Sequence, residues 1–315
     1  MHAITCTGCH KKETFFLRPH SKEQLCSECF AESIVKKVWE TILKYNMINH
    51  GDKIAVAVSG GKDSISLLHL MKYYKQNHVE FSLSAITVDE GIQNYREEAM
   101  EIATQNCKSQ KIEHHVISFK ELYGKTLDEI VFQLRKKKEG RLTPCAYCGV
   151  LRRKALNIAA RKANANKVAT AHTLDDEIQT FLLNMLHGDS TKFLSWNPNT
   201  NQGKTKLVDR IKPFCEIPEK ETALYAYAKK IRFQDNPCPY SSHAMRNDVR
   251  TFLNRVEDKK AGIKSSILCS MQILGSAAEK RLTNELLNEC DKCGEPTAKD
   301  ICRACEMLQT LYEYP

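Results

Sequence analysis

The chain has 315 residues, of which 42% are hydrophobic and 27% charged, a composition that can bury a core and excludes wholesale disorder. Its 47 lysines and arginines exceed its 38 aspartates and glutamates by nine, a basic excess that permits a polyanionic partner without requiring one. No apolar run approaches the roughly 18 residues that a membrane helix needs, and residues 1–6 lack the pattern of a secretory signal. We therefore expect a cytoplasmic protein without membrane association, whose 14 cysteines are metal ligands or reactive thiols rather than disulfides.

Eight of the cysteines form Cys-x-x-Cys pairs at the two ends of the chain. Two such turns can surround one cation with four thiolates, the ligand set of a structural zinc site, although four thiolates also suit iron and His10 or His20 offers an alternative ligand. Each end is too short to fold on a core of its own, so metal binding would supply its folding energy. The predicted zinc ligands are Cys6, Cys9, Cys26 and Cys29 in an N-terminal module (residues 1–30), and Cys290, Cys293, Cys302 and Cys305 in a C-terminal module (residues 286–315).

A glycine-rich loop stands between an apolar segment and a helical pattern in the first third of the chain. The apolar segment, 53–58, reads as a buried parallel strand, and the helix follows the loop. Loop N–H groups and the positive end of the helix together form a cradle for an anion, and the spacing differs from that of a Walker A loop. The loop residues are Ser59, Gly60, Gly61, Lys62, Asp63 and Ser64.

The hydrophobic pattern continues to alternate between strands and helices. This alternation predicts an α/β fold with a doubly wound parallel sheet, whose ligands lie beyond the carboxyl ends of the strands. Ser59, Asp89 and His172 follow expected strands and can therefore converge on one pocket. We expect further strands at 81–88, 112–118 and 167–171, and helices at 31–45, 95–109, 119–138, 151–163 and from about 172 to 187.

We assign this fold to a domain spanning residues 31–285 that ends in a helical part. The apolar segment 263–287 within it is either core or a dimer interface.

Three cysteines in the middle of the chain differ from the terminal sets. Cys145 and Cys148 form a pair without a nearby second pair, and Cys238 lies between two prolines that hold it in an extended turn. Three thiolates cannot close a tetrahedral zinc site. They suit a [4Fe–4S] cluster with one open iron, or a redox pair with a helper thiol. The alternative is two unrelated features, a redox pair and a buried thiol.

The ordered set of motifs resembles the PP-loop tRNA 2-thiouridine synthetases, the archaeal and eukaryotic wobble-thiolation (NcsA-like) group and its TtuA relatives. Related 2-thiocytidine enzymes lack the flanking ribbons, and GMP and NAD synthetases lack the cysteine trio. The resemblance covers nearly the whole chain. Between the two ribbons it runs through Ser-Gly-Gly-Lys-Asp-Ser, Cys-x-Tyr-Cys-Gly-Val-x-Arg-Arg, Ala-His-Thr-Leu-Asp-Asp-Glu, Arg-Ile-Lys-Pro and Cys-Pro-Tyr.

The resemblance implies an N-type ATP pyrophosphatase that adenylates the C2 oxygen of a tRNA uridine and replaces it with sulfur. It assigns residues 59–64 to the phosphates of ATP, and Thr87, Asp89 and His172 to the flanks of the nucleotide. Cys145, Cys148 and Cys238 would ligate the [4Fe–4S] cluster, and of Asp175 and Asp176 one would hold Mg²⁺ while the other serves the chemistry. Arg152 stands where TtuA-like enzymes tend to have lysine; its guanidinium keeps the charge but cannot transfer a proton, which favours the wobble-uridine group.

Partners and competing functions stay open at this stage. The sulfur donor can be a ubiquitin-like thiocarboxylate protein, a desulfurase relay or free sulfide, and a persulfide on Cys148 or Cys238 can replace the cluster route. The family suggests a homodimer. Basic groups support tRNA binding, although one basic run alone is typical of a solvated face. Amidation or lysidine-type ligation leaves the cysteine trio unexplained, and a non-catalytic zinc RNA-binding protein leaves the phosphate loop and the aspartate pair unexplained. The basic groups are Arg135–Lys138, Arg141, Arg152–Lys154, Arg161–Lys162, Lys229–Lys230, Arg232 and Lys259–Lys260.

Overall fold

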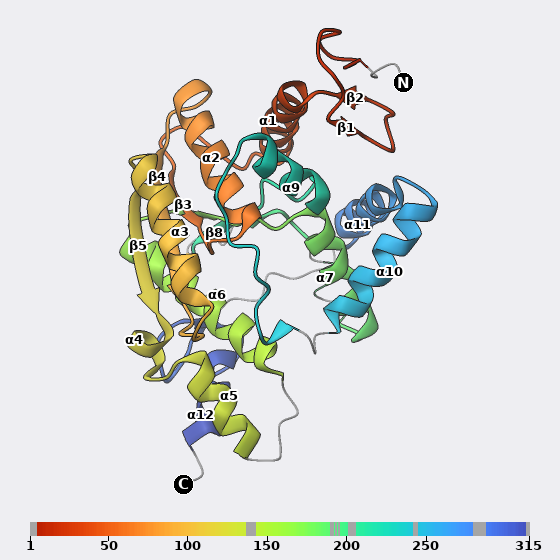
Figure 1. Cartoon of the computed structure of the whole chain (residues 1–315). Helices are drawn as coiled ribbons and strands as arrows, with labels where there is room; N and C mark the ends of the chain where they lie inside the picture. The colour runs from red at the N-terminus through yellow and green to blue at the C-terminus, as the bar shows by residue number, and fades with distance from the viewer. Residues whose placement is uncertain are drawn as a thin grey trace.

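A six-stranded sheet forms the centre of the molecule (Figure 1). The computed structural model describes residues 5–136, 143–189, 192, 194, 196–200, 206–241, 245–279 and 288–312. The strand order is β5-β4-β3-β6-β8-β7, and all neighbours pair in parallel except β7 and β8. The strands are β3 (Lys53–Ala57), β4 (Ser82–Asp89), β5 (Glu113–Ser118), β6 (Lys167–Ala169), β7 (Asn199–Thr200) and β8 (Asp209–Ile211).

Helices cover both faces of this sheet, so its central strand is buried on both sides. Ile54 and Val56 of β3 belong to one apolar cluster, and Ala55 between them belongs to a second cluster on the other face. This alternation is the period of two that a strand imposes on its side chains. The first cluster contains residues of α1 (Ser27–Lys44), α2 (Lys62–Asn77), α3 (Arg96–Ser109) and α9 (Glu219–Ala228); the second contains residues of α4 (Phe119–Tyr123), α5 (Leu127–Lys136), α6 (Pro144–Lys162) and α12 (Arg303–Tyr312).

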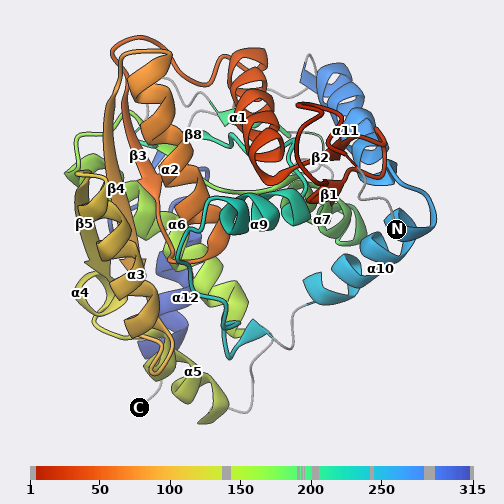
Figure 2. The same cartoon turned by 45° about the horizontal axis from the view of Figure 1, so that its top comes forward.

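A third apolar cluster holds together α7 (Leu174–Leu186), α10 (Arg246–Lys259) and α11 (Ile263–Glu279) (Figure 2). Leu268 and Met271 of α11 are buried against α7, whereas Ile273 is 70% exposed. Of the apolar segment 263–287, the described part thus contributes to the core on one face, and residues 280–287 lie outside the described residues.

The two cysteine modules lie at opposite ends of the molecule (Figure 1). In the N-terminal module β1 (Phe16–Leu17) and β2 (Gln24–Leu25) form an antiparallel pair next to α1. In the C-terminal module β9 (Asn288–Glu289) pairs with β10 (Pro296–Thr297), and α12 packs on α5 and α6.

The expected doubly wound α/β sheet is confirmed, with three local differences. The helix expected over 119–138 is two helices, because Gly124 adopts a left-handed φ of +70° and ends α4; residues 137 and 138 lie outside the described residues. The helix expected from residue 151 begins at Pro144, where Thr143 caps it through the N–H of Ala146. Strands β7 and β8 were not expected, since they have only two and three residues.

Candidate active site

The glycine-rich loop of residues 59–64, named the phosphate loop from here on, lies between the carboxyl end of β3 and the first turn of α2. Its shape depends on Gly60. This residue has a φ of +94°, and a Cβ there would lie 2.6 Å from the backbone oxygen of Ala99 on α3. Ser64 closes the loop from inside: its hydroxyl accepts from the N–H of Ser59 (3.1 Å) and donates to the carbonyl of Gly61 (2.9 Å). Gly61 is the N-cap of α2 and offers no side-chain cap. The helix therefore presents its first N–H groups and positive dipole end to an anion.

Lys62, the cation of this loop, is held between two carboxylates. Its Nζ lies 2.9 Å from Asp63 Oδ2 and 2.9 Å from Glu219 Oε1 on α9. Burial lowers the pKa of Lys62, but the two carboxylates outweigh burial and the net shift is upward. Asp63 also accepts a hydrogen bond from the hydroxyl of Thr222. Sequence reasoning missed Glu219 and Thr222; the Pro-Glu-Lys-Glu-Thr start of α9 was the available signal, but nothing local connects it to the loop.

The three residues expected to flank the nucleotide lie at the carboxyl ends of β4 and β6, as predicted. Thr87 is buried, and its hydroxyl donates to the carbonyl of Val58 (2.8 Å). Asp89 accepts from the N–H two residues further along the chain (2.8 Å). The exposed His172 ring shares a hydrogen bond with the hydroxyl of Thr170 (2.9 Å). Their roles towards a nucleotide stay predictions.

The two aspartates at the start of α7 make different contacts. Asp176 accepts from both the N–H and the hydroxyl of Thr173 (2.9 Å each) and so closes a capping box. Asp175 is buried, accepts from the N–H of Glu219 (2.7 Å) and pairs with Lys264 on α11. Of the two, only Asp175 therefore contacts the Lys62–Glu219 pair.

The three middle cysteines come together although they are distant in sequence. Cys145 and Cys148 occupy the first turns of α6, and the thiol of Cys145 donates to the carbonyl of Tyr240 (3.3 Å), two residues beyond Cys238. The pKa of Cys148 is raised to about 11, mainly by burial; Arg152 opposes this shift, and Cys238 makes a small contribution to it. Burial likewise raises the pKa of Cys238, and Cys145 acts in the same direction. Cys238 and Tyr240 also pack against the apolar cluster that contains Cys148, so all three cysteines belong to one region of the molecule.

The donor set of this trio fits an iron–sulfur cluster better than a single ion. Among the described residues, only the two terminal sets have all their sulfur atoms within 4.8 Å of one another. The trio is more widely spaced, and three thiolates around a four-iron cube leave one iron without a protein ligand. A single zinc ion would require a tighter set of four ligands.

A chain of ion pairs around the buried carboxylate of Glu90 connects the trio to the phosphate loop. The Arg152 guanidinium lies 3.0 Å from the sulfur of Cys148 and 2.6 Å from Glu90 Oε1. The other oxygen of Glu90 lies 2.9 Å from Arg96 Nε, and Arg96 donates to the carbonyl of Ser59 (2.9 Å). The Glu90 carboxylate is the main reason that the pKa of Arg152 is raised. Glu90 and Arg96 were not predicted; both follow the end of β4, but their pairing is a tertiary contact.

The segment leading to Cys238 provides a second connection. Gln234 donates its N–H to the carbonyl of Gly60 (2.9 Å), and its side chain donates to the carbonyl of Tyr95 (2.7 Å). Cys238 therefore follows, four residues later, a point fixed on the phosphate loop.

The two terminal modules have the predicted ligand geometry. Their sulfur atoms form two complete sets of four, so neither His10 nor His20 is needed as a ligand. The N–H of Gly8 donates to Cys6 (3.4 Å) and that of Cys302 to Cys290 (3.2 Å). Hydrogen bonds from backbone N–H groups, first that of Cys26, lower the pKa of Cys6 to about 6. Such thiolate sets suit a closed, structural zinc ion.

Comparison with known proteins agrees with this architecture. A PP-loop domain family matches residues 31–257. The cytoplasmic tRNA 2-thiolation protein 1 of Chlamydomonas reinhardtii is 35% identical over 97% of this chain and 84% of its own length; that of Danio rerio is 31% identical over 98% and 88%. The chain belongs to the PP-loop family of the cytoplasmic tRNA 2-thiolation proteins. A similar solved structure is the U34-tRNA thiolase NcsA from Methanococcus maripaludis with its [4Fe–4S] cluster, with a TM-score of 0.83, 32% identity and coverage of 99% and 97% of the two chains.

The family and fold expected from the sequence are thereby confirmed. None of the helices described in this family member is long and apolar enough to cross a membrane. The predicted domain boundaries at residues 30 and 285 stay predictions, since the family match ends at residue 257.

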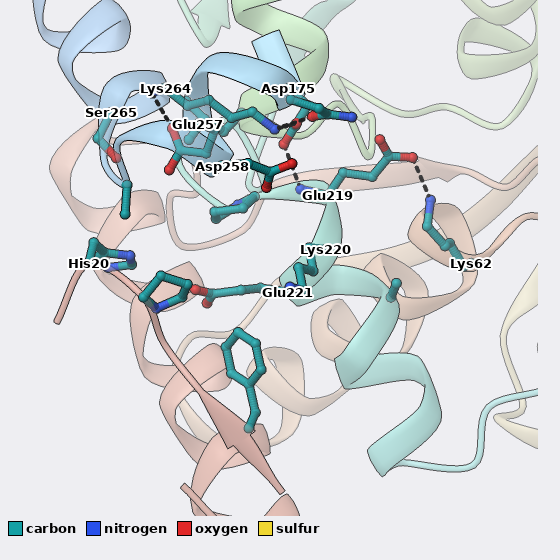
Figure 3. Close-up of a pocket in the computed structure, with 17 residues that line it drawn as sticks. His20, Lys62, Asp175, Glu219, Lys220, Glu221, Glu257, Asp258, Lys264 and Ser265 are labelled. Atoms are coloured by element: carbon teal, nitrogen blue, oxygen red, sulfur yellow. Dashed lines mark hydrogen bonds and ion pairs between the residues drawn. The ribbon is translucent and has the colours of Figure 1, made fainter. Parts of the chain in front are cut away.

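A cavity of about 560 Å³ adjoins Lys62 of the phosphate loop (Figure 3). Lys62 stands at one end and His20 of the N-terminal module at the other, with Asp175, Glu219 and Lys264 along one wall. None of the three middle cysteines lines it. The cavity therefore adjoins the phosphate loop and not the three middle cysteines.

Several of the basic residues expected to face RNA are engaged within the protein. Arg152 pairs with Glu90, and Arg161 pairs with Glu295 of the C-terminal module. Arg153 differs from these two, because its side chain has no carboxylate partner among the described residues. The same holds for Arg210, whose guanidinium donates to the carbonyl of Arg153 (3.1 Å). Lys137, Lys138 and Arg141 lie outside the described residues.

Proposed function

We propose that this chain is an ATP-dependent tRNA-uridine 2-sulfurtransferase of the cytoplasm that acts on the wobble uridine. One observation carries the proposal: the phosphate loop and the three-thiol group are joined by the Arg96–Glu90–Arg152 chain of ion pairs, whose carboxylate is buried. A loop suited to ATP and thiols suited to sulfur delivery thus belong to one site. The family of the chain and the names of its relatives support the same assignment.

The reaction follows from the chemistry of uracil. The C2 oxygen is a poor leaving group, so it first attacks the α-phosphorus of ATP and releases pyrophosphate. Lys62 and the loop N–H groups stabilise the charge that develops on the phosphates. The carboxylates of Asp63, Asp175 and Glu219 would supply oxygen ligands for the Mg²⁺ that accompanies ATP. Sulfide then adds to C2, and AMP departs with the oxygen.

The cysteine trio supplies the sulfur side of this scheme. A [4Fe–4S] cluster held by Cys145, Cys148 and Cys238 would offer one open iron for a sulfide. Arg152 orients the Cys148 sulfur and places a fixed positive charge beside it, and Glu90 holds Arg152 in place. A persulfide on Cys148 or Cys238 is the alternative carrier on the same residues. The partners that we propose are tRNA, a sulfur donor (a ubiquitin-like thiocarboxylate protein or sulfide) and a second copy of the chain.

The proposal is tested on tRNA from cells that lack the gene. Mass spectrometry of the nucleosides should show that 2-thiouridine derivatives disappear from the wobble position and return with the wild-type gene but not with a Lys62→Ala gene. Unchanged 2-thiouridine in the deletion strain would contradict the proposal. Loss of a 2-thiouridine elsewhere in the tRNA would correct the position while keeping the reaction.

A further inference from the structure

The N-terminal module is attached to the catalytic core by a buried ion pair. Arg18 of the module is 1% exposed and donates from Nε and from a terminal nitrogen to the two oxygens of Glu221 on α9 (2.9 Å and 3.0 Å). The same guanidinium reaches Glu23 (2.6 Å) and the hydroxyl of Ser33 (3.0 Å), and Lys37 lies 3.6 Å from Glu221. A two-pronged arginine–carboxylate pair fixes orientation as well as distance.

The first turn of α9 that receives this pair also holds the phosphate loop. Glu219 and Thr222 lie three residues apart, so they share one face of the helix, and Glu221 points away from them. Glu219 binds Lys62 (2.9 Å), and Thr222 donates to Asp63. The N–H of Glu219 donates to Asp175 (2.7 Å), which fixes the same turn to α7. The first turn of α9 thus contacts the N-terminal module on one side and the phosphate loop on the other.

We infer that the N-terminal module sets the position of the phosphate loop through the first turn of α9, which makes Arg18 and Glu221 positioning residues for ATP binding. A helical turn is rigid, so displacing Glu221 also displaces Glu219 and Thr222. Removing the charge of Glu221 would leave Arg18 with Glu23 and Ser33 alone, so the turn of α9 would lose the charged contact that fixes it to the module. This inference rests on the proposed function in one respect, that the loop binds ATP.

The C-terminal module provides a comparison, because an arginine–carboxylate pair, here more exposed, also attaches it to a helix of the core. Glu295 of that module pairs with Arg161 of α6 and accepts from the side chain of Asn157 (3.0 Å). Helix α6 carries Cys145 and Cys148 and takes no part in the contacts of Lys62 and Asp63. Breaking this second pair should therefore spare the phosphate loop.

The experiment measures the dissociation constant of ATP–Mg²⁺ by equilibrium dialysis for the full-length wild type and for Glu221→Gln, Arg18→Lys and Glu295→Gln. Bound metal per chain and far-UV circular dichroism are recorded for every sample. We expect Glu221→Gln to weaken ATP binding by about 3-fold to about 30-fold, the range of mutations that act through an intervening element. Arg18→Lys, which keeps the charge but loses the two-pronged geometry, should have a smaller effect of the same sign, and Glu295→Gln should bind ATP as the wild type does.

Each outcome decides the inference. Wild-type ATP affinity in a Glu221→Gln protein with its full metal content would overturn it, as would an equal loss in Glu295→Gln. If Glu221→Gln does not fold, Arg18→Lys decides alone: wild-type affinity overturns the inference, and weaker binding with full metal content supports it. A wild-type protein that fails to bind ATP would instead refute the proposed function, so the two failures are distinguishable.

Discussion

At the scale of single residues, Lys62 carries the assignment of the phosphate loop. The charge of its ammonium is balanced by the carboxylates of Asp63 and Glu219. An incoming phosphate must replace these carboxylates at Lys62, and the displaced carboxylates would be suitable ligands for Mg²⁺. We predict that Lys62→Ala lowers kcat/KM for tRNA thiolation by at least about 10²-fold, because the developing phosphate charge loses its cation. Lys75→Ala, an exposed lysine of the same helix, is the control and should behave as the wild type. Wild-type turnover in Lys62→Ala would remove the loop from the mechanism.

Glu90 is the residue on which the connection between the two halves of the site depends. Its carboxylate lies between Arg96 and Arg152, and it is 3% exposed. We predict that Glu90→Gln lowers the free energy of unfolding by about 1.5–3 kcal/mol, because the carboxylate loses its charged contacts with Arg96 and Arg152. Urea titration measures this change.

The same variant should lose thiolation while keeping its affinity for ATP, since Arg152 would no longer be fixed beside Cys148. Glu113→Gln, at an exposed site on β5, serves as the control. A Glu90→Gln protein with wild-type thiolation would show that the chain of ion pairs is dispensable.

At the scale of elements, the loop between β3 and α2 is shaped by its contact with α3. Gly60 and Gly262 share a φ of +94°, but a Cβ at Gly60 would meet the backbone of Ala99, whereas Gly262 has open space around it. We predict that Gly262→Ala costs only the backbone strain of about 1–2 kcal/mol. Gly60→Ala should cost clearly more and abolish ATP binding, because loop and α3 must separate. Thermal unfolding with and without ATP compares the two; equal destabilisation would contradict the steric explanation.

The start of α6 places two of the three middle cysteines. If Cys145, Cys148 and Cys238 share one cluster, any single Ala variant leaves two protein ligands, and we predict that each loses the visible absorption of the cluster together with activity. Bound zinc and ATP affinity should remain, because neither depends on the trio. Anaerobic reconstitution with and without iron provides the measurement. Full activity in iron-free protein supplied with a persulfide donor would favour the persulfide route instead.

At the scale of the whole molecule, the two modules stand at opposite ends, and each is attached to a helix that carries part of the site. We predict about two zinc ions per chain, one for each set of four cysteines. Cys6→Ser or Cys290→Ser should lose one ion and unfold at lower temperature, because metal binding and module folding are coupled. Elemental analysis of the purified protein and thermal unfolding give the test; a well-folded wild type without zinc would contradict it.

Local sequence was sufficient for everything that depends on neighbours along the chain. The phosphate loop is recognisable because strand, glycines and helix are contiguous, and the two four-cysteine modules because their cysteines come in close pairs. The parallel pairing of β3 with β4 and β6 then brings Ser59, Asp89 and His172 to the carboxyl ends of neighbouring strands, as expected. The family resemblance added Cys238 to Cys145 and Cys148, which spacing alone left open.

Only the tertiary structure decided which charges meet. Glu219, 157 residues from Lys62, and Glu90, 62 residues from Arg152, are acidic residues like many others in the sequence, and their partners are set by how α9 packs on α2 and α6 on β4. The same packing divides Asp175 from Asp176, giving one to the site and the other to a helix cap. Whether two side chains so far apart in the sequence meet depends on how the helices and strands pack, and the local hydrophobic pattern carries no information about that. The sequence by itself therefore determined which chemical groups the loop, the cysteine trio and the modules contain, and the fold determined how these are joined.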